Sequence, residues 1–190
     1  MIVLRLYLLA GLLAHKAVWE ILKRRKAPAE PSKSQPQPLS VKLVKAVKVA
    51  ILLGIVAQTM LPEIFPITPE PMQVRAIGIA IYTAGLLIAV IARFQLDHNW
   101  SDIETAQVLT HQAVVSNGIY GYIRHSIYVG DLLLLFGLEL SLNSWLVLGV
   151  ALLTPMVLIQ ATLEEKKLIS VLPGYELYCR NTKRFIPFVI

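Results

Sequence analysis

The sequence predicts an all-α integral membrane protein with about five transmembrane helices, and three observations lead to that fold class. Of the 190 residues, 56% are hydrophobic and 16% are charged, whereas soluble domains carry about 25% charged residues. The apolar residues gather in long segments, and the mean hydropathy is +0.63. Basic residues, which give the net charge of +6, stand at the ends of these segments, as in membrane proteins. We therefore expect no nucleic-acid partner, and the single cysteine, Cys179, excludes an internal disulfide.

The five expected spans differ in length and polarity. Segment 74–96 has the length that ~30 Å of hydrocarbon requires. The last two segments are joined by the short connection "SLNS" (141–144), so we expect them to form an antiparallel helical hairpin. All five spans are mainly apolar, and they lie near residues 2–22, 43–61, 74–96, 127–141 and 144–163.

The first segment is the most polar of the five, because His15, Lys16 and Glu20 interrupt it. A signal peptide is the alternative interpretation, with Arg5 before the apolar stretch. No clear small-x-small cleavage site directly follows Ala14, which favours a retained helix.

The charges of the connecting segments predict the orientation in the membrane. "KRRKAPAEPSKSQPQP" (23–38) is basic and rich in proline and serine, and it is expected to form a flexible cytosolic loop near 26–40. Segment 62–73 has two glutamates and no lysine or arginine. The positive-inside rule then places the amino terminus outside and the carboxyl terminus in the cytoplasm. We expect a multi-pass protein of the plasma or inner membrane.

Two polar blocks stand on the cytosolic side of this predicted arrangement. Residues 97–117 precede the fourth span, and "EEKKLISVLPGYELYCRNTKRFIP" (164–187) follows the fifth. If the last two spans form a hairpin, the blocks meet. We therefore divide the chain into amino-terminal spans, residues 1–96, and a carboxy-terminal region, residues 97–190. The second block is amphipathic, and the side chains expected on the membrane surface are Leu168, Leu172, Tyr175, Leu177 and Tyr178.

The stretch "GIYGYIRHSIYVG" (118–130) resembles a signature of integral-membrane methyltransferases, G-x-Y-x-x-x-R-H-P-x-Y-x-G, in the isoprenylcysteine carboxyl methyltransferase family. The second block resembles that family's paired glutamates, tyrosines and closing R-x-x-P. The resemblance covers about residues 94–190. It implies a methyltransferase that uses S-adenosyl-L-methionine in a cytosolic pocket of the last two helices. The acceptor would be a lipophilic small molecule or lipid entering from the bilayer.

Site residues follow from the positions of the motifs. The resemblance implies cofactor contacts from the stretch before the signature, from the signature and from the first glutamate of the pair: Gln112, Ala113, Val114, Val115, Tyr120, His125, Ser126, Ile127, Tyr128 and Glu164. Tyrosine faces suit a sulfonium cation, and a carboxylate accepts hydrogen bonds from hydroxyl or ammonium groups. The candidate catalytic residues are Arg124, His125 and Asp131, the substrate-binding candidate is Gln160, and we expect no metal.

Three positions depart from the family pattern. Gln112 replaces a histidine, and Ser126 replaces the proline that follows Arg-His, which removes a fixed φ and restores an N–H. Gln160 replaces an arginine that holds a substrate carboxylate in carboxyl-methylating members. Asp131 lies on the same helix face as Tyr128. A neutral or cationic acceptor is therefore expected, and O-, N- and S-methylation all remain open.

Other interpretations compete with this one. The tyrosines suit an interfacial aromatic belt, and Arg124 and His125 suit positive-inside anchors. The run 164–167 suits a solvated helix end. Alternative functions are a phospholipid (amine) N-methyltransferase, an NADPH-dependent membrane reductase and a non-catalytic small membrane protein.

Overall fold

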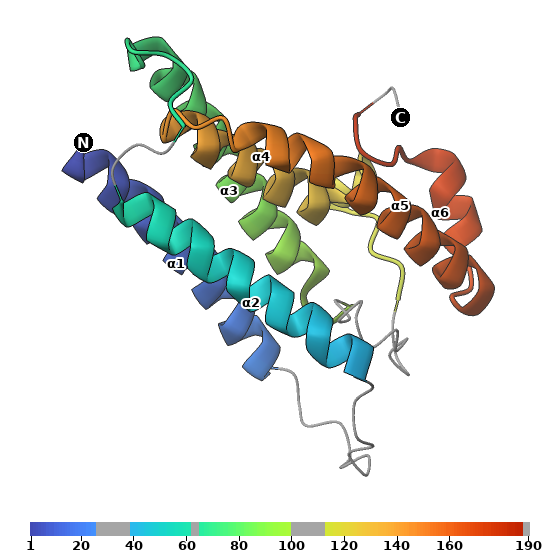
Figure 1. Ribbon diagram of the computed structural model, residues 1–190. Coiled ribbons are helices and arrows are strands. Elements are labelled where there is room, and N and C mark those ends of the chain that lie inside the picture. The colour runs from blue at the N-terminus through green and yellow to red at the C-terminus, as the bar shows by residue number, and fades with distance from the viewer. Residues whose placement is uncertain (26–38, 62–64, 100–112, 188–190) are drawn as a thin grey trace.

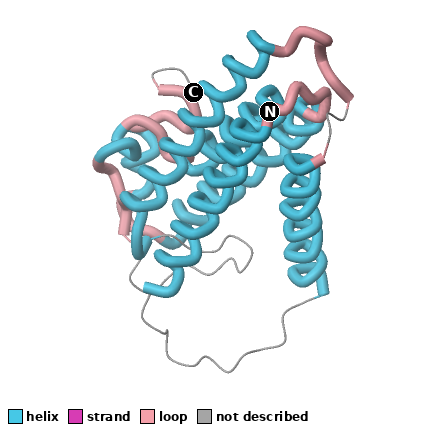
Figure 2. Tube along the Cα trace, turned by 90° about the vertical axis from the view of Figure 1, so that its left-hand side faces the viewer, coloured by secondary structure: helices cyan, strands magenta, loops and turns pink. Residues whose placement is uncertain are grey.

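The computed structural model describes residues 1–25, 39–61, 65–99 and 113–187, and its regular structure in these ranges is helical. Figure 2 shows helices and loops only. The elements are α1 (Ile2–Arg25), α2 (Leu39–Met60), α3 (Met72–Leu96), η1 (Asp97–Asn99), η3 (Gly118–Gly121), α4 (Ser126–Ser141), α5 (Val147–Val171) and α6 (Tyr175–Asn181).

The helix lengths support an integral membrane protein. Of the described helices, α1, α3 and α5 are long and apolar enough to span a membrane. Helix α4 is apolar but has 16 residues, which is about 24 Å and short of ~30 Å of hydrocarbon. The apolar part of α2 that the structure describes, Val49–Met60, is also short. The prediction of membrane helices is confirmed, and the number of five spans stays a prediction.

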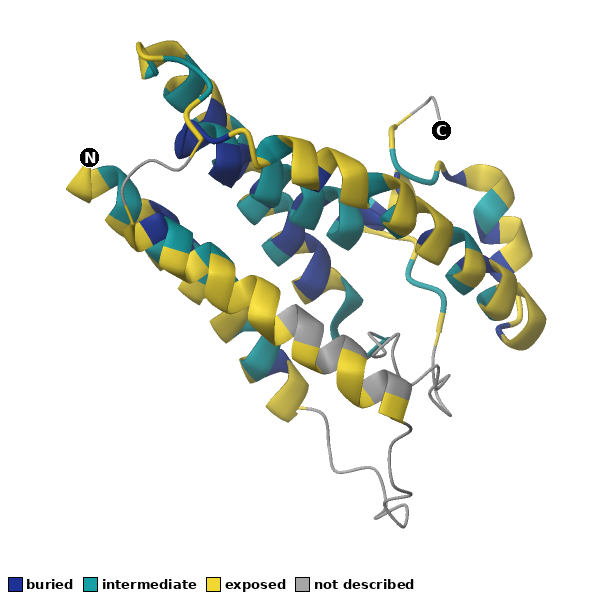
Figure 3. Ribbon diagram, in the orientation of Figure 1, coloured by how far each residue is buried: buried dark blue, intermediate teal, exposed yellow. Residues whose placement is uncertain are grey.

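Among the described helices, the closest packing joins α3 to α4 (Figure 1). Small residues make this possible: a Cβ on Gly85 would collide with the Leu134 backbone nitrogen, and one on Gly137 with that of Tyr82. Around this seam lies a buried apolar cluster that also includes Leu8 and Leu138. In Figure 3 the buried residues accordingly concentrate on α3 and α4, whereas α2 is largely exposed.

The turn between α4 and α5 is built on Asn143. This residue has a φ of 56°, in the left-handed region that asparagine tolerates better than most residues. Its side chain accepts from Thr68 N at 3.2 Å and donates to Thr68 O at 2.8 Å. The turn is thereby fixed to the segment before α3, and α4 and α5 run antiparallel. We call the other end of these helices, where α3 and α5 end and α4 begins, the pocket end.

Helix α6 corrects one expectation about the membrane surface. Leu172, Tyr175 and Tyr178 are buried and form a cluster with Val114 and Leu168. Tyr175 and Tyr178 are three residues apart on α6 and therefore share one face, which packs on Leu172, Leu168 and Val114 at the pocket end. The expectation of surface contact is wrong for these buried side chains; of the predicted set, Leu177 is 63% exposed.

Candidate active site

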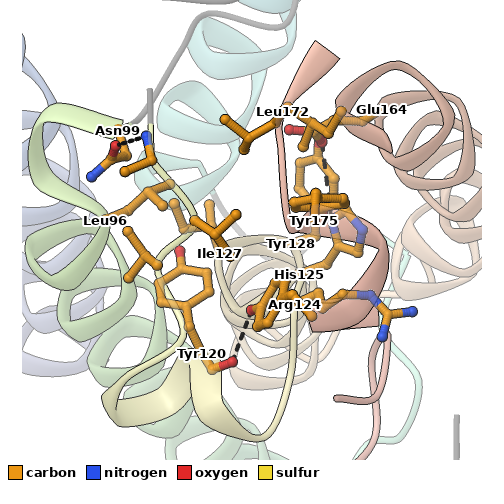
Figure 4. A pocket seen from close by; sticks show the side chains of 15 residues that line it. Leu96, Asn99, Tyr120, Arg124, His125, Ile127, Tyr128, Glu164, Leu172 and Tyr175 are labelled. Atoms are coloured by element: carbon orange, nitrogen blue, oxygen red, sulfur yellow. Dashed lines mark hydrogen bonds and ion pairs between the residues drawn. The ribbon is translucent and has the colours of Figure 1, made fainter. Parts of the chain in front are cut away.

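A cavity opens at the pocket end, between the carboxyl end of α3, the segment from 113 to 128, and α5–α6 (Figure 4). Its empty volume is about 700 Å³, and this figure includes the part that is open to solvent. The lining is mainly apolar and aromatic with a few polar groups: Leu96, Asn99, Ala113, Val114, Val115, Tyr120, Arg124, His125, Ile127, Tyr128, Glu164, Leu168, Leu172, Tyr175 and Tyr178.

The first wall depends on a glycine turn. Gly118 has a φ of 56° and begins η3, and a Cβ there would meet the Gln95 side chain. The same side chain accepts from Ile119 N at 2.9 Å. The turn is therefore docked on the last residues of α3, and it directs Tyr120 into the interior, where only 4% of the residue is exposed.

The second wall is the irregular segment from Ala113 to Ser116. Ala113 N donates to Asn99 Oδ1 at 2.7 Å, and Val114 packs on the cluster of Leu172 and the α6 tyrosines. The backbone of this segment is thus held between the end of α3 and α6, beside the cavity.

Ser126, which stands where the resembling family has proline, begins α4 in a buried position. Its hydroxyl donates to Ile123 O at 2.8 Å. The turn before α4 therefore has a side-chain hydrogen bond where the fixed φ of proline is missing. Ser126 does not line the cavity.

A buried ionic cluster lies behind the cavity, and we call it the Glu165 clamp. Glu165 Oε1 is 2.9 Å from Arg124 Nε and 3.0 Å from His125 Nε2, and Oε2 is 2.7 Å from an Arg184 nitrogen. Arg124 also donates to the carbonyl oxygens of Cys179 and Thr182. Because every oxygen of Glu165 has a charged or polar donor, the clamp meets the conditions for a tolerated buried ion pair.

Beside the clamp, main-chain hydrogen bonds join the signature stretch, residues 118–130, to the second polar block, residues 164–187. Lys183 N donates to Tyr122 O, Arg124 N to Lys183 O, and His125 N to Arg184 O, at 2.9–3.1 Å. Residues 122–125 and 183–184 therefore lie side by side as a short parallel bridge. The segment after α6 is therefore part of the scaffold around the cavity.

Glu164 and Glu165 are neighbours in sequence but face different surroundings. The Glu165 side chain is 6% exposed and faces the clamp, whereas that of Glu164 is 27% exposed and lines the cavity. Tyr128 OH donates to Glu164 Oε2 at 2.9 Å, and the His125 ring stacks on Tyr128 at 5.3 Å. Figure 4 shows the Arg124 guanidinium turned away from the cavity. Of the two glutamates, Glu164 is the one that lines the cavity.

Three tyrosines complete the aromatic side of the cavity. Tyr178 OH donates to Tyr120 O at 2.8 Å, and Tyr175 and Tyr178 pack edge to face. Burial raises the pKa of the Tyr120, Tyr175 and Tyr178 phenols above the ordinary tyrosine value. They remain neutral at physiological pH, so they present π-faces and hydrogen-bonding hydroxyls to a ligand.

The structure places most sequence-predicted site residues around this cavity. Gln112 lies outside the described residues. Asp131 lies one turn beyond Tyr128 and binds His15, and it is not part of the cavity lining. Gln160 is exposed on α5, one turn before Glu164 and outside the lining. The cofactor candidates that line the cavity are Ala113, Val114, Val115, Tyr120, His125, Ile127, Tyr128 and Glu164.

Sequence reasoning missed the roles of Glu165, Arg184, Tyr175 and Tyr178. Glu165 and Arg184 stand in the paired glutamates and the closing R-x-x-P, so the signal for them was present. The inward direction of the two tyrosines had no sequence signal, because an amphipathic helix looks alike on a membrane surface and on a protein surface.

The family model of phospholipid methyltransferases matches residues 73–172, which is more than half of the chain. The chain belongs to the phospholipid methyltransferase family. The match spans α3, α4 and α5 and most of the cavity. Helices α1, α2 and α6 lie outside it.

A solved structure has the same fold. The eukaryotic intramembrane Ras methyltransferase, isoprenylcysteine carboxyl methyltransferase, solved without a monobody, aligns with a TM-score of 0.63 and 19% identity over 93% of this chain. This chain spans 63% of the length of that protein. The likeness extends the shared fold to almost the whole chain. No curated protein matches the sequence significantly.

Proposed function

We propose that this protein transfers a methyl group from S-adenosyl-L-methionine to a lipophilic acceptor that reaches the pocket end from the bilayer. One observation carries the proposal: the signature stretch, 118–130, and the second polar block, 164–187, meet around one cavity in a member of the phospholipid methyltransferase family. The cofactor would supply an electrophilic methyl group on a positively charged sulfur.

The chemistry of the lining fits this cofactor. The faces of Tyr120, Tyr128 and Tyr175 suit a sulfonium cation. The Glu164 carboxylate, held by Tyr128, suits the ammonium group or the ribose hydroxyls. The backbone of residues 113–115 suits the adenine edge. His125, which is held by Glu165 and stacked on Tyr128, keeps this wall in place.

The acceptor side is the surface toward the bilayer. Gln160 is exposed on α5 one turn before Glu164, so we propose that it contacts the acceptor from the lipid side rather than from within the cavity. The cavity would accelerate the methyl transfer by positioning the acceptor against the cofactor and by excluding water. Arg124, proposed as catalytic from the sequence, acts through the clamp by positioning His125 and Glu165.

Binding of S-adenosylhomocysteine, the demethylated product, tests this function directly. Calorimetry on the purified full chain in detergent should show saturable binding, and Glu164→Gln should weaken it by about tenfold, because a charge-assisted hydrogen bond contributes about 1.5–3 kcal/mol. The matched control is Glu176→Gln on α6, where Glu176 is exposed and pairs with Arg180. Absence of binding by the wild type contradicts the proposed function.

The orientation is the second part of the proposal: amino terminus outside, pocket end and carboxyl terminus cytoplasmic. A Cys179→Ser background, which removes the native cysteine, permits labelling of single introduced cysteines. Asn117→Cys at the pocket end should be protected from an impermeant reagent in intact cells, and Glu70→Cys at the opposite end should react. The reverse pattern would place the cavity on the face that lacks cytosolic cofactor.

A further inference from the structure

A polar pair joins α1 to α4 within the helical bundle. His15 Nε2 lies 2.9 Å from Asp131 Oδ1, and the two side chains are 22% and 40% exposed. By residue count, His15 is roughly 15 Å from the carboxyl end of α1, and Asp131 is about 7.5 Å inside α4. Ionisable groups at such depth are costly unless they are paired, and they usually have a function.

The pair lies beside the cavity. Asp131 follows Ile127 and Tyr128 by four and three residues, and both of these line the cavity. All three therefore share one face of α4. The pair is thus one helical turn deeper in the bundle than the cavity wall.

The orientation of the histidine ring is fixed on two sides. Trp19, one turn further along α1, stacks on it with ring centroids 4.1 Å apart and planes at 25°. Nε2 faces the Asp131 carboxylate. A proton on Nε2, donated to Asp131, leaves Nδ1 as the acceptor nitrogen, since the partner of one ring nitrogen sets the state of the other. The arrangement is a histidine base oriented by a carboxylate.

We propose that the His15–Asp131 pair is the acceptor subsite of this enzyme and takes the proton that an amine, thiol or hydroxyl acceptor must lose. The proposal rests on the proposed function. The acceptor atom bonds to the methyl carbon while the bond from that carbon to sulfur breaks and its electron pair stays on sulfur. The acceptor's proton moves to His15 Nδ1, Asp131 balances the imidazolium charge, and the proton then passes to water.

The same pair selects among acceptors. A carboxylate has no proton to lose, and the negative charge of Asp131 repels it in a medium of low dielectric. An ammonium or a neutral proton-bearing group is favoured. Helix α1, which lies outside the family match, would in this way supply a catalytic residue.

Two probes, dodecylamine and dodecanoic acid, distinguish an amine acceptor from a carboxylate acceptor, because their alkyl chains are alike. Calorimetry on the full chain saturated with S-adenosylhomocysteine should show tighter binding of the amine. Asp131→Asn should lower the amine affinity by roughly tenfold, the equivalent of about 1.4 kcal/mol, and leave that of the acid unchanged or improved. Equal binding of both probes, or no effect of Asp131→Asn on the amine, overturns the acceptor subsite.

The variant His15→Gln distinguishes a role of His15 in proton transfer from a purely structural role. In His15→Gln the amide N–H can still donate to Asp131, but no basic nitrogen remains. Amine methylation should fall by about 10²-fold or more, whereas amine affinity stays within about twofold. Methylation of the acid should not change. The proposal is overturned if His15→Gln lowers the methylation of both probes in proportion, or if it does not lower the methylation of the amine. It is also overturned if the wild type binds S-adenosylhomocysteine but does not methylate the amine.

Tyr7→Phe is the matched control on the same helix. It removes the hydrogen bond from α1 to Thr83 Oγ1, 2.6 Å long and distant from the pocket end. Its methylation rates should equal those of the wild type, and a loss as large as that of His15→Gln would assign the His15 effect to helix docking and overturn the proposal. Failure of the wild type to bind S-adenosylhomocysteine is a different result, which contradicts the proposed function itself.

Discussion

The pocket end and the amino-terminal helices are held together by different forces. At the pocket end, one buried carboxylate, Glu165, binds three cationic or polar side chains, and main-chain bonds tie residues 122–125 to 183–184. Helices α1 and α2 pack on α3 and α4 through an apolar cluster that includes Leu8 and Tyr82, and individual polar contacts such as His15 to Asp131 add to this packing.

This difference fits two tasks, which are to hold a cofactor and to admit an acceptor. A cofactor site requires groups held in one geometry, which a network of charge-assisted hydrogen bonds provides. An acceptor that arrives from lipid requires access, which lightly packed helices allow. Variants of the two regions should therefore differ in what they damage: cofactor binding and stability at the pocket end, acceptor use at α1.

The largest effect is expected at the centre of the clamp. Glu165→Gln removes the charge that balances Arg124 and Arg184, and breaking a buried pair costs about 3–5 kcal/mol. Denaturant unfolding in detergent should show this loss, and S-adenosylhomocysteine binding should disappear. Glu176→Gln, in an exposed pair with Arg180, should cost at most ~1 kcal/mol. Equal stability of the two variants would contradict the structural role of the clamp.

The next effect is expected at the seam between α3 and α4. Gly85→Ala places a methyl group against the Leu134 backbone, and overpacking of this kind costs about 1–3 kcal/mol. Gly149→Ala on α5 is the control, because the added Cβ has no atom within 4 Å apart from its chain neighbours and the nearby backbone of its own helix. Unfolding of both variants measures the difference. If Gly85→Ala is as stable as Gly149→Ala, helices α3 and α4 are further apart than described.

A smaller effect is expected within the aromatic wall. Tyr178→Phe removes the hydrogen bond to Tyr120 O, which contributes about 0.5–1.5 kcal/mol, and it leaves the ring packing intact. Stability should fall by that amount, with a few-fold loss of S-adenosylhomocysteine affinity measured by calorimetry. An unchanged affinity together with reduced stability would limit Tyr178 to a structural role.

The smallest effect on cofactor binding is expected at Gln160. Because Gln160 is exposed and outside the cavity lining, Gln160→Arg should change S-adenosylhomocysteine affinity by less than about twofold. If the residue contacts the acceptor, the variant should raise methylation of dodecanoic acid relative to dodecylamine, since arginine pairs with carboxylates. A large loss of cofactor affinity would instead place Gln160 at the cofactor.

The sequence predicted much of the cavity because its signals are local. The signature positions Tyr120, His125, Ile127 and Tyr128 all line it, as does Glu164. The spacing of a motif determines which residues stand together on one turn or one helix face. The family followed from the same motifs, and the match over residues 73–172 confirms it. The division of the chain at residue 96 stays a prediction, and the α3–α4 seam crosses it.

By itself, the sequence determined that the chain is helical and enters the membrane, since hydrophobicity adds up along a segment without reference to its partners. Only the tertiary structure decided which of the two adjacent glutamates, Glu164 or Glu165, faces the cavity. Adjacent helical residues point about 100° apart, so the rotation of α5 directs Glu164 to the cavity and Glu165 to the clamp. The tertiary structure also pairs His15 with Asp131, two residues that are 116 positions apart in the sequence. A polar residue in a span shows that a partner is required, but only packing selects the partner.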